Sequence, residues 1–238
     1  MRPLVTAHSG CENTKPNSLE FITAAVDCGA DAAEIDVRIT KDRVPVLSHD
    51  NNYKASSFTG IKSIAETGYA DLKGIVPLIN VLDETAGKDL QLNLDIKDFS
   101  CIDEVMEIIT KTGAGRRCVF SGYTAQQAAS LKNLYPDAGF MVNVSEEFIP
   151  ENIIELYKSD KKAYIDYLTD IYGRSGGICL NMSYDYCDAD IVDILRKRYV
   201  PVSLWTIDDI SLMKTYAKSG VYAITTRNVK RLLEIISD

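Results

Sequence analysis

Short runs of apolar, often β-branched residues alternate along the chain with longer segments whose apolar residues recur at helical spacing. The short runs predict strands at residues 4–7, 33–39, 90–96, 118–121, 139–144, 177–181, 200–206 and 222–225, with 44–48 as an extension of the second unit. The longer patterns predict helices at residues 19–28, 78–86, 102–112, 125–134, 150–157, 189–198, 210–219 and 229–236. Asn17 with Glu20 three residues later predicts a capping box at the start of the first helix.

Strands and helices that alternate at this spacing predict a parallel sheet with helical crossovers. An open doubly wound sheet and a closed (β/α)₈ barrel both satisfy the pattern. A count of about eight units and the length of 238 residues favour the barrel. We therefore expect residues 1–238 to form a single TIM-barrel domain, with residues 51–76 as a loop excursion over the barrel mouth.

Composition narrows the possible partners. A net charge of −8 argues against nucleic acid or an anionic membrane surface, although it allows a local positive pocket. The chain shows no signal-peptide pattern, and no apolar run approaches the roughly 20 residues of a membrane span. The six cysteines stand singly without a Cys-x-x-Cys pair, which predicts reduced thiols and a cytoplasmic location. The oligomeric state stays open.

Two carboxylates, Glu34 and Asp36, follow one another with a single residue between them in the second predicted strand. Alternate residues of a strand point to the same side, so these like charges would lie together. A divalent cation between them would relieve the repulsion. On spacing alone, a strand end whose acids face water is an equally good interpretation.

Other polar residues also fall where predicted strands end, which is where the active sites of parallel barrels lie. His8 and His49, the two histidines of the chain, follow the first strand and the 44–48 run. Asn93, Asp95 and Lys97 alternate to one side of the third strand. Each residue alone has a structural explanation, such as an Asp95–Lys97 ion pair, but their joint position favours a functional site.

This combination predicts the cleavage of a phosphodiester. Three oxygen ligands suit Mg²⁺ or Ca²⁺, and the candidates are Glu34, Asp36 and Asp95. Such a metal would neutralise phosphate charge and activate a nucleophile. His8 and His49 suit a general acid and a general base, and Lys97 would hold a phosphate oxygen.

These residues resemble the motifs of the glycerophosphodiester phosphodiesterases, barrel hydrolases of lipid metabolism. The resemblance runs nearly end to end and includes His8-Ser9-Gly10, Asn17-Ser18-Leu19-Glu20, Glu34-Ile35-Asp36-Val37, His49-Asp50, Asn93-Leu94-Asp95-Ile96-Lys97, Trp205-Thr206 and Gly220-Val221. It implies metal ligands at Glu34, Asp36 and Asp95, an acid–base pair at His8 and His49, and substrate or phosphate contacts at Lys97, Trp205, Ser9 and Asn17. It also implies a course in which the glycerol 2-hydroxyl attacks phosphorus and water then opens the cyclic phosphate.

The sequence departs from the family pattern at three positions. Ser9 stands where the family usually has arginine, Pro16 where it has glutamate, and Asp95 where it has a longer glutamate. These changes suggest a shifted substrate or reduced activity. Glu12 would reach the site only through a looped-out insertion, and Lys54 or Lys62 could replace the missing arginine charge.

Two alternatives stay open. Sphingomyelinase D-like phospholipases of the same superfamily also carry Asp-x-Lys on this strand, lack the arginine and release a cyclic phosphate. A non-catalytic barrel that binds phosphorylated ligands is the other alternative, although such a protein has no need of two histidines. The sequence does not identify the alcohol leaving group or choose between Mg²⁺ and Ca²⁺.

Overall fold

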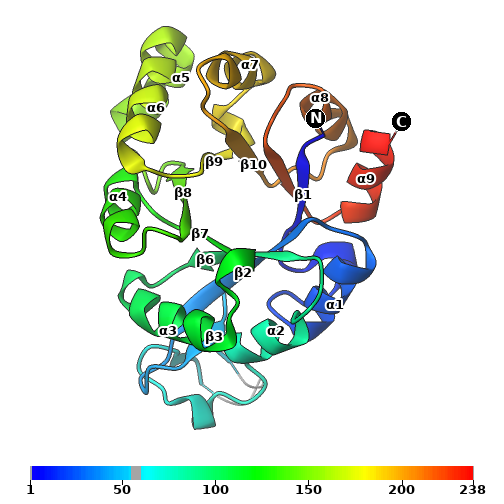
Figure 1. The fold of residues 1–238 in the computed structure, drawn as a ribbon, viewed down its shortest axis with the longest axis vertical. Coiled ribbons are helices and arrows are strands. Elements are labelled where there is room, and N and C mark those ends of the chain that lie inside the picture. Colours follow the sequence, from blue (N-terminus) through cyan, green and yellow to red (C-terminus); the bar gives the residue numbers. More distant parts are fainter. Residues whose placement is uncertain (1, 55–59, 238) are drawn as a thin grey trace.

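Eight parallel strands close into a barrel that is ringed by helices in a computed structural model, which describes residues 2–54 and 60–237 (Figure 1). The barrel strands are β1 (Leu4–Ala7), β2 (Ala32–Ile39), β6 (Gln91–Ile96), β7 (Cys118–Ser121), β8 (Gly139–Val144), β9 (Cys179–Ser183), β10 (Val202–Trp205) and β11 (Ala223–Thr226). Each strand pairs in parallel with the next, and β11 pairs with β1 to close the barrel. The predicted (β/α)₈ barrel is confirmed.

The helices cover the outside of the barrel (Figure 1). They are α1 (Leu19–Asp27), α2 (Leu78–Glu84), α3 (Ile102–Thr112), α4 (Ala125–Leu134), α5 (Glu151–Ser159), α6 (Lys161–Ser175), α7 (Ala189–Lys197), α8 (Ile210–Ala217) and α9 (Val229–Ser237). Short 3₁₀ turns lie at Cys11–Asn13, Tyr69–Asp71, Phe99–Cys101, Gly115–Arg117 and Tyr184–Tyr186.

The sequence interpretation missed α6. Asp160 ends α5 and also caps α6, where its Oδ1 accepts a hydrogen bond from Ala163 N at 3.0 Å. The two helices therefore follow each other without a loop. The polar residues at this junction hide the boundary, although Ile165 and Leu168 of α6 are buried in the core.

The second strand shows how the barrel separates core from site. Ala33, Ile35 and Val37 of β2 are completely buried in the hydrophobic core that the strands share with the helices. Glu34 and Asp36 alternate with them and line a cavity. Both sides of the strand are thus covered, as is usual for parallel sheets.

The segment after β2 forms a small substructure of its own. β3 (Pro45–Leu47) runs antiparallel to β2, and β4 (Asn52–Tyr53) pairs with β5 (Lys62–Ser63). An apolar cluster of Val46, Ile64 and Leu72 supports this part, which projects from one side of the ring (Figure 1). Coverage of the barrel mouth by residues 51–76 stays a prediction, because residues 55–59 lie outside the described residues.

Within the described ranges, we find no helix with the length and apolar character that crossing a lipid bilayer requires.

Candidate active site

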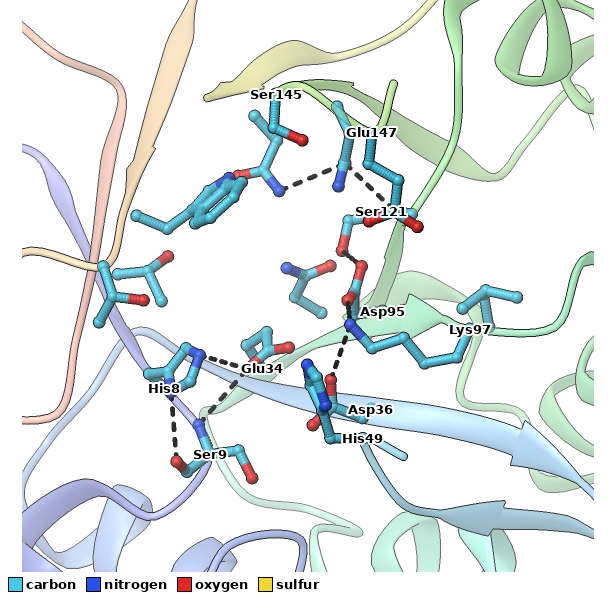
Figure 2. Close-up of a pocket in the computed structure, with 18 of the residues that line it drawn as sticks. His8, Ser9, Glu34, Asp36, His49, Asp95, Lys97, Ser121, Ser145 and Glu147 are labelled. Carbon is cyan, nitrogen blue, oxygen red and sulfur yellow. Dashed lines mark hydrogen bonds and ion pairs between the residues drawn. The ribbon is translucent and has the colours of Figure 1, made fainter. Parts of the chain in front are cut away.

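A cavity of about 850 Å³ opens at the carboxyl ends of the barrel strands. Figure 2 shows His8 and Ser9 on one side, with Ser145 and Glu147 across the cavity from them. The cavity is lined by all the residues to which the family resemblance gives a metal-binding, acid–base or substrate-binding role, namely His8, Ser9, Asn17, Glu34, Asp36, His49, Asp95, Lys97 and Trp205.

Three carboxylates meet at the base of the cavity. Glu34 and Asp36 are buried on β2, and the register of the sheet sets Asp36 beside Asp95 on β6. One oxygen from each acid lies within 4.8 Å of the others. Burial, together with the charges of Asp36 and Asp95, raises the pKa of Glu34 well above its usual range. This set of crowded oxygen donors fits a divalent cation.

Lys97 neutralises part of this charge (Figure 2). Its Nζ lies 3.0 Å from Asp36 Oδ1 and also donates a hydrogen bond to Asp95 Oδ2. Burial opposes the charged form, but Asp95 and Asp36 outweigh it and raise the pKa of Lys97. Ser121 Oγ donates to the other oxygen of Asp95 at 2.8 Å. Both oxygens of Asp95 are therefore held in place.

Asn17 binds a carboxylate instead of capping a helix. Its Nδ2 donates to Asp36 Oδ2 at 2.7 Å, and Asp36 N donates to its Oδ1 at 3.1 Å. The predicted cap is wrong, because Ser18 Oγ accepts the hydrogen bond from Phe21 N. Asn17 turns toward the acid with φ 53°, in the left-handed region that asparagine tolerates. Buried Ser9 fixes this turn, since its Oγ accepts from Asn17 N at 2.8 Å.

His8 lies beside the carboxylates. Its Nδ1 is 3.2 Å from Ser9 O, and its Nε2 is 3.8 Å from Glu34 Oε2. Burial and the nearby charge of Arg227 lower the pKa of His8. A neutral ring that donates Nδ1–H to the Ser9 carbonyl has its lone pair on Nε2.

His49 occupies a much wetter position, with 71% of its side chain exposed. Its Nδ1 lies 2.8 Å from Asp50 Oδ1, and this contact lowers the pKa of Asp50. The backbone is held more firmly than the ring, because His49 O accepts from Arg38 Nε and Nη2 at 3.0 and 2.8 Å. The two histidines thus differ in burial and in partner.

Two buried polar atoms in the cavity wall have no hydrogen-bond partner within residues 2–54 and 60–237. They are Asn93 Oδ1, an acceptor, and Trp205 Nε1, a donor. Buried polar atoms are nearly always paired, so these two are available to a polar ligand.

Gly122 allows the close approach of β7 and β6 at the cavity wall. With φ 91°, a Cβ at this position would lie 2.5 Å from Ile96 O. Only glycine fits both conditions. Gly122 N also donates to Asn143 Oδ1 at 3.1 Å, which joins the next strand to this wall.

Several lining residues were not singled out from the sequence. They include Arg38, Phe99, Thr124, Gln127, Ser145, Glu147, Phe148 and Arg227. Arg227 and Ser145 each directly follow a strand, which is the one signal that would have found them.

The proposed charge replacements do not reach the cavity. Neither Lys54 nor Lys62 is among the described residues that line it. Glu12 instead turns outward, and its Oε1 accepts from Lys230 N at 3.2 Å at the start of α9.

Comparison with known proteins gives a consistent result. The sequence profile of the glycerophosphoryl diester phosphodiesterase family matches residues 8–231. Glycerophosphodiester phosphodiesterase 1 of Rattus norvegicus is 27% identical over 162 residues, which cover 66% of this chain and 46% of the rat protein. The chain thus spans about half the length of the first curated relatives it matches.

Solved structures share the fold at low identity. A glycerophosphodiester phosphodiesterase of Thermotoga maritima has a TM-score of 0.77 at 20% identity, with 99% of each chain covered. An Oleispira antarctica phosphodiesterase, in complex with the product sn-glycerol-3-phosphate, has a TM-score of 0.78 at 22% identity, with 100% of this chain and 98% of that chain covered.

Proposed function

The chain belongs to the glycerophosphoryl diester phosphodiesterase family, and we propose that it hydrolyses glycerophosphodiesters to an alcohol and glycerol phosphate with the help of a divalent metal. The observation that carries this proposal is the convergence of Glu34, Asp36 and Asp95 in one cavity, with His8 in contact with Glu34.

The three carboxylates would hold Mg²⁺ or Ca²⁺. When bound, the cation would neutralise phosphate charge and lower the barrier to attack on phosphorus. Asn17 and Ser121 orient two of these acids through hydrogen bonds. Such outer contacts commonly set the position and the affinity of metal ligands.

His8 is the better general base. The hydrogen bond to Ser9 O holds its proton on Nδ1, and its lowered pKa keeps Nε2 unprotonated near neutral pH. Nε2 would accept the proton of the glycerol 2-hydroxyl as that oxygen bonds to phosphorus. The bond from phosphorus to the head-group oxygen breaks in the same step.

His49 is the corresponding acid. Asp50 Oδ1 lies 2.8 Å from Nδ1, where it would accept a hydrogen bond and orient the ring. Nε2 would then donate its proton to the departing alcohol oxygen. Water would open the cyclic phosphate with the two roles exchanged, and this step would yield glycerol phosphate.

The glycerol moiety needs polar partners of its own. Asn93 Oδ1 and Trp205 Nε1, an acceptor and a donor without partners in the described residues, would pair with its hydroxyl oxygens. Lys97 would contact a phosphate oxygen only with the part of its ammonium that faces the cavity, since Asp36 and Asp95 already bind it.

The whole chain would act as one domain, because the barrel strands and the helices share one main core. The protein would be cytoplasmic, since all six cysteines are free.

³¹P NMR of the purified protein with glycerophosphocholine, glycerophosphoethanolamine or glycerophosphoinositol, each with Mg²⁺ or Ca²⁺, tests the proposal. We expect glycerol phosphate to form, and EDTA to stop the reaction. His8→Ala should lower the rate by about 10²–10⁴-fold. Asp36→Asn should abolish metal-dependent turnover, whereas Asp193→Asn, a matched change at an acid of α7 that pairs with Arg196 and Lys197 outside the cavity, should leave it unchanged.

Two results would contradict the proposal. Cyclic phosphate as the end product would favour the cyclising phospholipase D-like alternative. Failure to turn over any diester, with glycerol 3-phosphate still bound, would favour a non-catalytic barrel.

A further inference from the structure

A phosphodiester needs cationic partners, and most cationic side chains of the cavity already bind other groups of the protein. Among residues 2–54 and 60–237, the cationic side chains that line it besides the histidines are Arg38, Lys97 and Arg227. Arg38 donates from Nε and Nη2 to His49 O and pairs through Nη1 with Asp98 at 3.4 Å. Lys97 lies between two carboxylates. Arg227 is the remaining candidate.

The barrel register brings Arg227 to the same level as His8. Ala7 at the end of β1 pairs with Thr226 at the end of β11, so His8 and Arg227 are the next residues of two adjacent strands. His8 N donates to Thr226 O at 2.9 Å. Glu12 N donates to Arg227 O at 2.9 Å, which fastens the two loops together.

The guanidinium is partly fixed and partly available. Asp208 accepts from Arg227 N at 2.8 Å and from Nη1 at 2.9 Å, and Thr226 Oγ1 donates to the same carboxylate at 3.0 Å. Arg227 Nε and Nη2 have no hydrogen-bond partner among the described residues, and half of the side chain is exposed. One edge of the planar group is therefore held while donors remain for a ligand.

We propose that Arg227 binds the phosphate oxygens of the substrate and of the product, and thus supplies at the end of β11 the guanidinium that Ser9 lacks. This inference rests on the proposed function and assigns a phosphate-binding residue to the same site. Arginine forks match phosphate oxygens through charge-assisted hydrogen bonds. Loops after the last two strands of TIM barrels frequently form phosphate sites, and Asp208 and Arg227 lie on those two loops.

Asp208 acts as the positioning residue in this arrangement. It orients the guanidinium through one side-chain and one backbone hydrogen bond. The replacement for the missing arginine is therefore Arg227, which follows the strand next to β1, and not Lys54 or Lys62 of the 51–76 segment. The cation thus enters from the His8 side of the cavity.

Isothermal titration of Arg227→Gln with sn-glycerol 3-phosphate and with inorganic phosphate, in saturating Mg²⁺, tests the assignment. We expect binding to weaken by about tenfold or more, the equivalent of one charge-assisted contact. The control is Arg231→Gln, which removes an arginine of α9 that pairs with Glu234 outside the cavity and should bind as the wild type does. Arg227→Lys retains the charge without the fork and should fall between the two.

Phosphate binding can be measured without turnover, so the role of Arg227 and the proposed hydrolysis can be refuted separately. Phosphate binding that depends on Arg227 in a protein that hydrolyses no diester would overturn the proposed function and keep this assignment. Hydrolysis with equal KM in the wild type and in Arg227→Gln would overturn the assignment alone. Equal affinity of both Arg227 variants and the wild type for phosphate would also overturn it, and thermal unfolding of each variant reports whether it is folded.

Discussion

Lys97→Met tests the charge balance of the acid cluster. Lys97 is largely buried, with 23% of its side chain exposed, and its Nζ lies 3.0 Å from Asp36 Oδ1. At an effective dielectric constant of about 20, one charge pair at this distance is worth about 5.5 kcal/mol before desolvation is counted. Desolvation of the lysine cancels part of this gain, yet its removal leaves two acids without a cation. Loss of one partner of a buried pair costs about 3–5 kcal/mol.

We therefore expect Lys97→Met to destabilise the metal-free protein by about 3 kcal/mol, which lowers Tm by about 6–12 °C for a chain of this size. Divalent metal should compensate, because a cation that binds the native acids stabilises the fold by mass action. The rise in Tm on addition of MgCl₂ should accordingly be larger in the variant than in the wild type.

Thermal unfolding followed by circular dichroism, in EDTA and in saturating MgCl₂, measures both quantities. Lys111→Met is the matched control, since Lys111 pairs with Glu107 on the exposed face of α3. Surface substitutions of this kind usually change stability by less than about 0.5 kcal/mol. An unchanged Tm in EDTA, or an equal Mg²⁺ response in variant and wild type, would refute this account of the cluster.

Three further predictions concern the same cavity. Asn17→Ala removes both contacts to Asp36 and should weaken Mg²⁺ binding by about 10–100-fold in a calorimetric titration; unchanged affinity would show that Asp36 needs no orientation. Because the pKa of Glu34 is raised in the folded protein, its stabilising effect is present below the ordinary value of 4.5 and is lost as pH rises. Glu34→Gln should therefore stabilise the metal-free protein by about 0.5–2 kcal/mol at pH 7 but not at pH 4 in urea unfolding, and an equal gain at both pH values would contradict this. Because the pKa of His8 is lowered, its base form persists below the ordinary value of 6.5, so the acidic limb of kcat/KM should lie below that pH; a limb above it would exclude His8 as the base.

Much of the fold could be predicted from the sequence, because the hydrophobic pattern marks the strands and the polar residues of the site occupy the alternate positions of those strands. The alternation of Ile35 and Val37 with Glu34 and Asp36 predicts a strand with one side in the core and one side in a site, and the structure has that arrangement. The prediction missed helix α6 for a local reason: Asp160 is both the C-cap of α5 and the N-cap of α6, so no loop residues separate the two helices. The prediction that Asn17 caps α1 was also wrong for a local reason. An asparagine that caps a helix and one that bonds to a neighbouring strand have the same sequence signature.

The contact between Arg227 and the His8 loop could not be predicted from the sequence pattern alone. The motif that carries the two histidines lies in the first 50 residues, whereas Arg227 directly follows the last strand and meets His8 only when β11 closes against β1. Barrel closure is a property of the whole sheet. Residues that follow the last strand can contact residues more than 200 positions away, as the hydrogen bond from Lys230 N to Glu12 Oε1, with a separation of 218 residues, illustrates.

The charges of the cavity link the proposed metal site to the proposed role of Arg227. Deprotonation of all three carboxylates, which metal binding requires, would give the cluster a net charge of −2 once the ammonium of Lys97 is counted. An anionic phosphodiester would be repelled by this charge at close range. A bound divalent cation would bring the net charge of the cluster to zero. The cluster would then no longer repel the phosphate, but it would also have no net positive charge to attract it. Arg227, with Nε and Nη2 unpaired among the described residues, would then supply the remaining attraction from the end of β11, beside His8. Under the proposed assignment, the guanidinium absent at Ser9 would be replaced by one that barrel closure brings to the site from the end of β11.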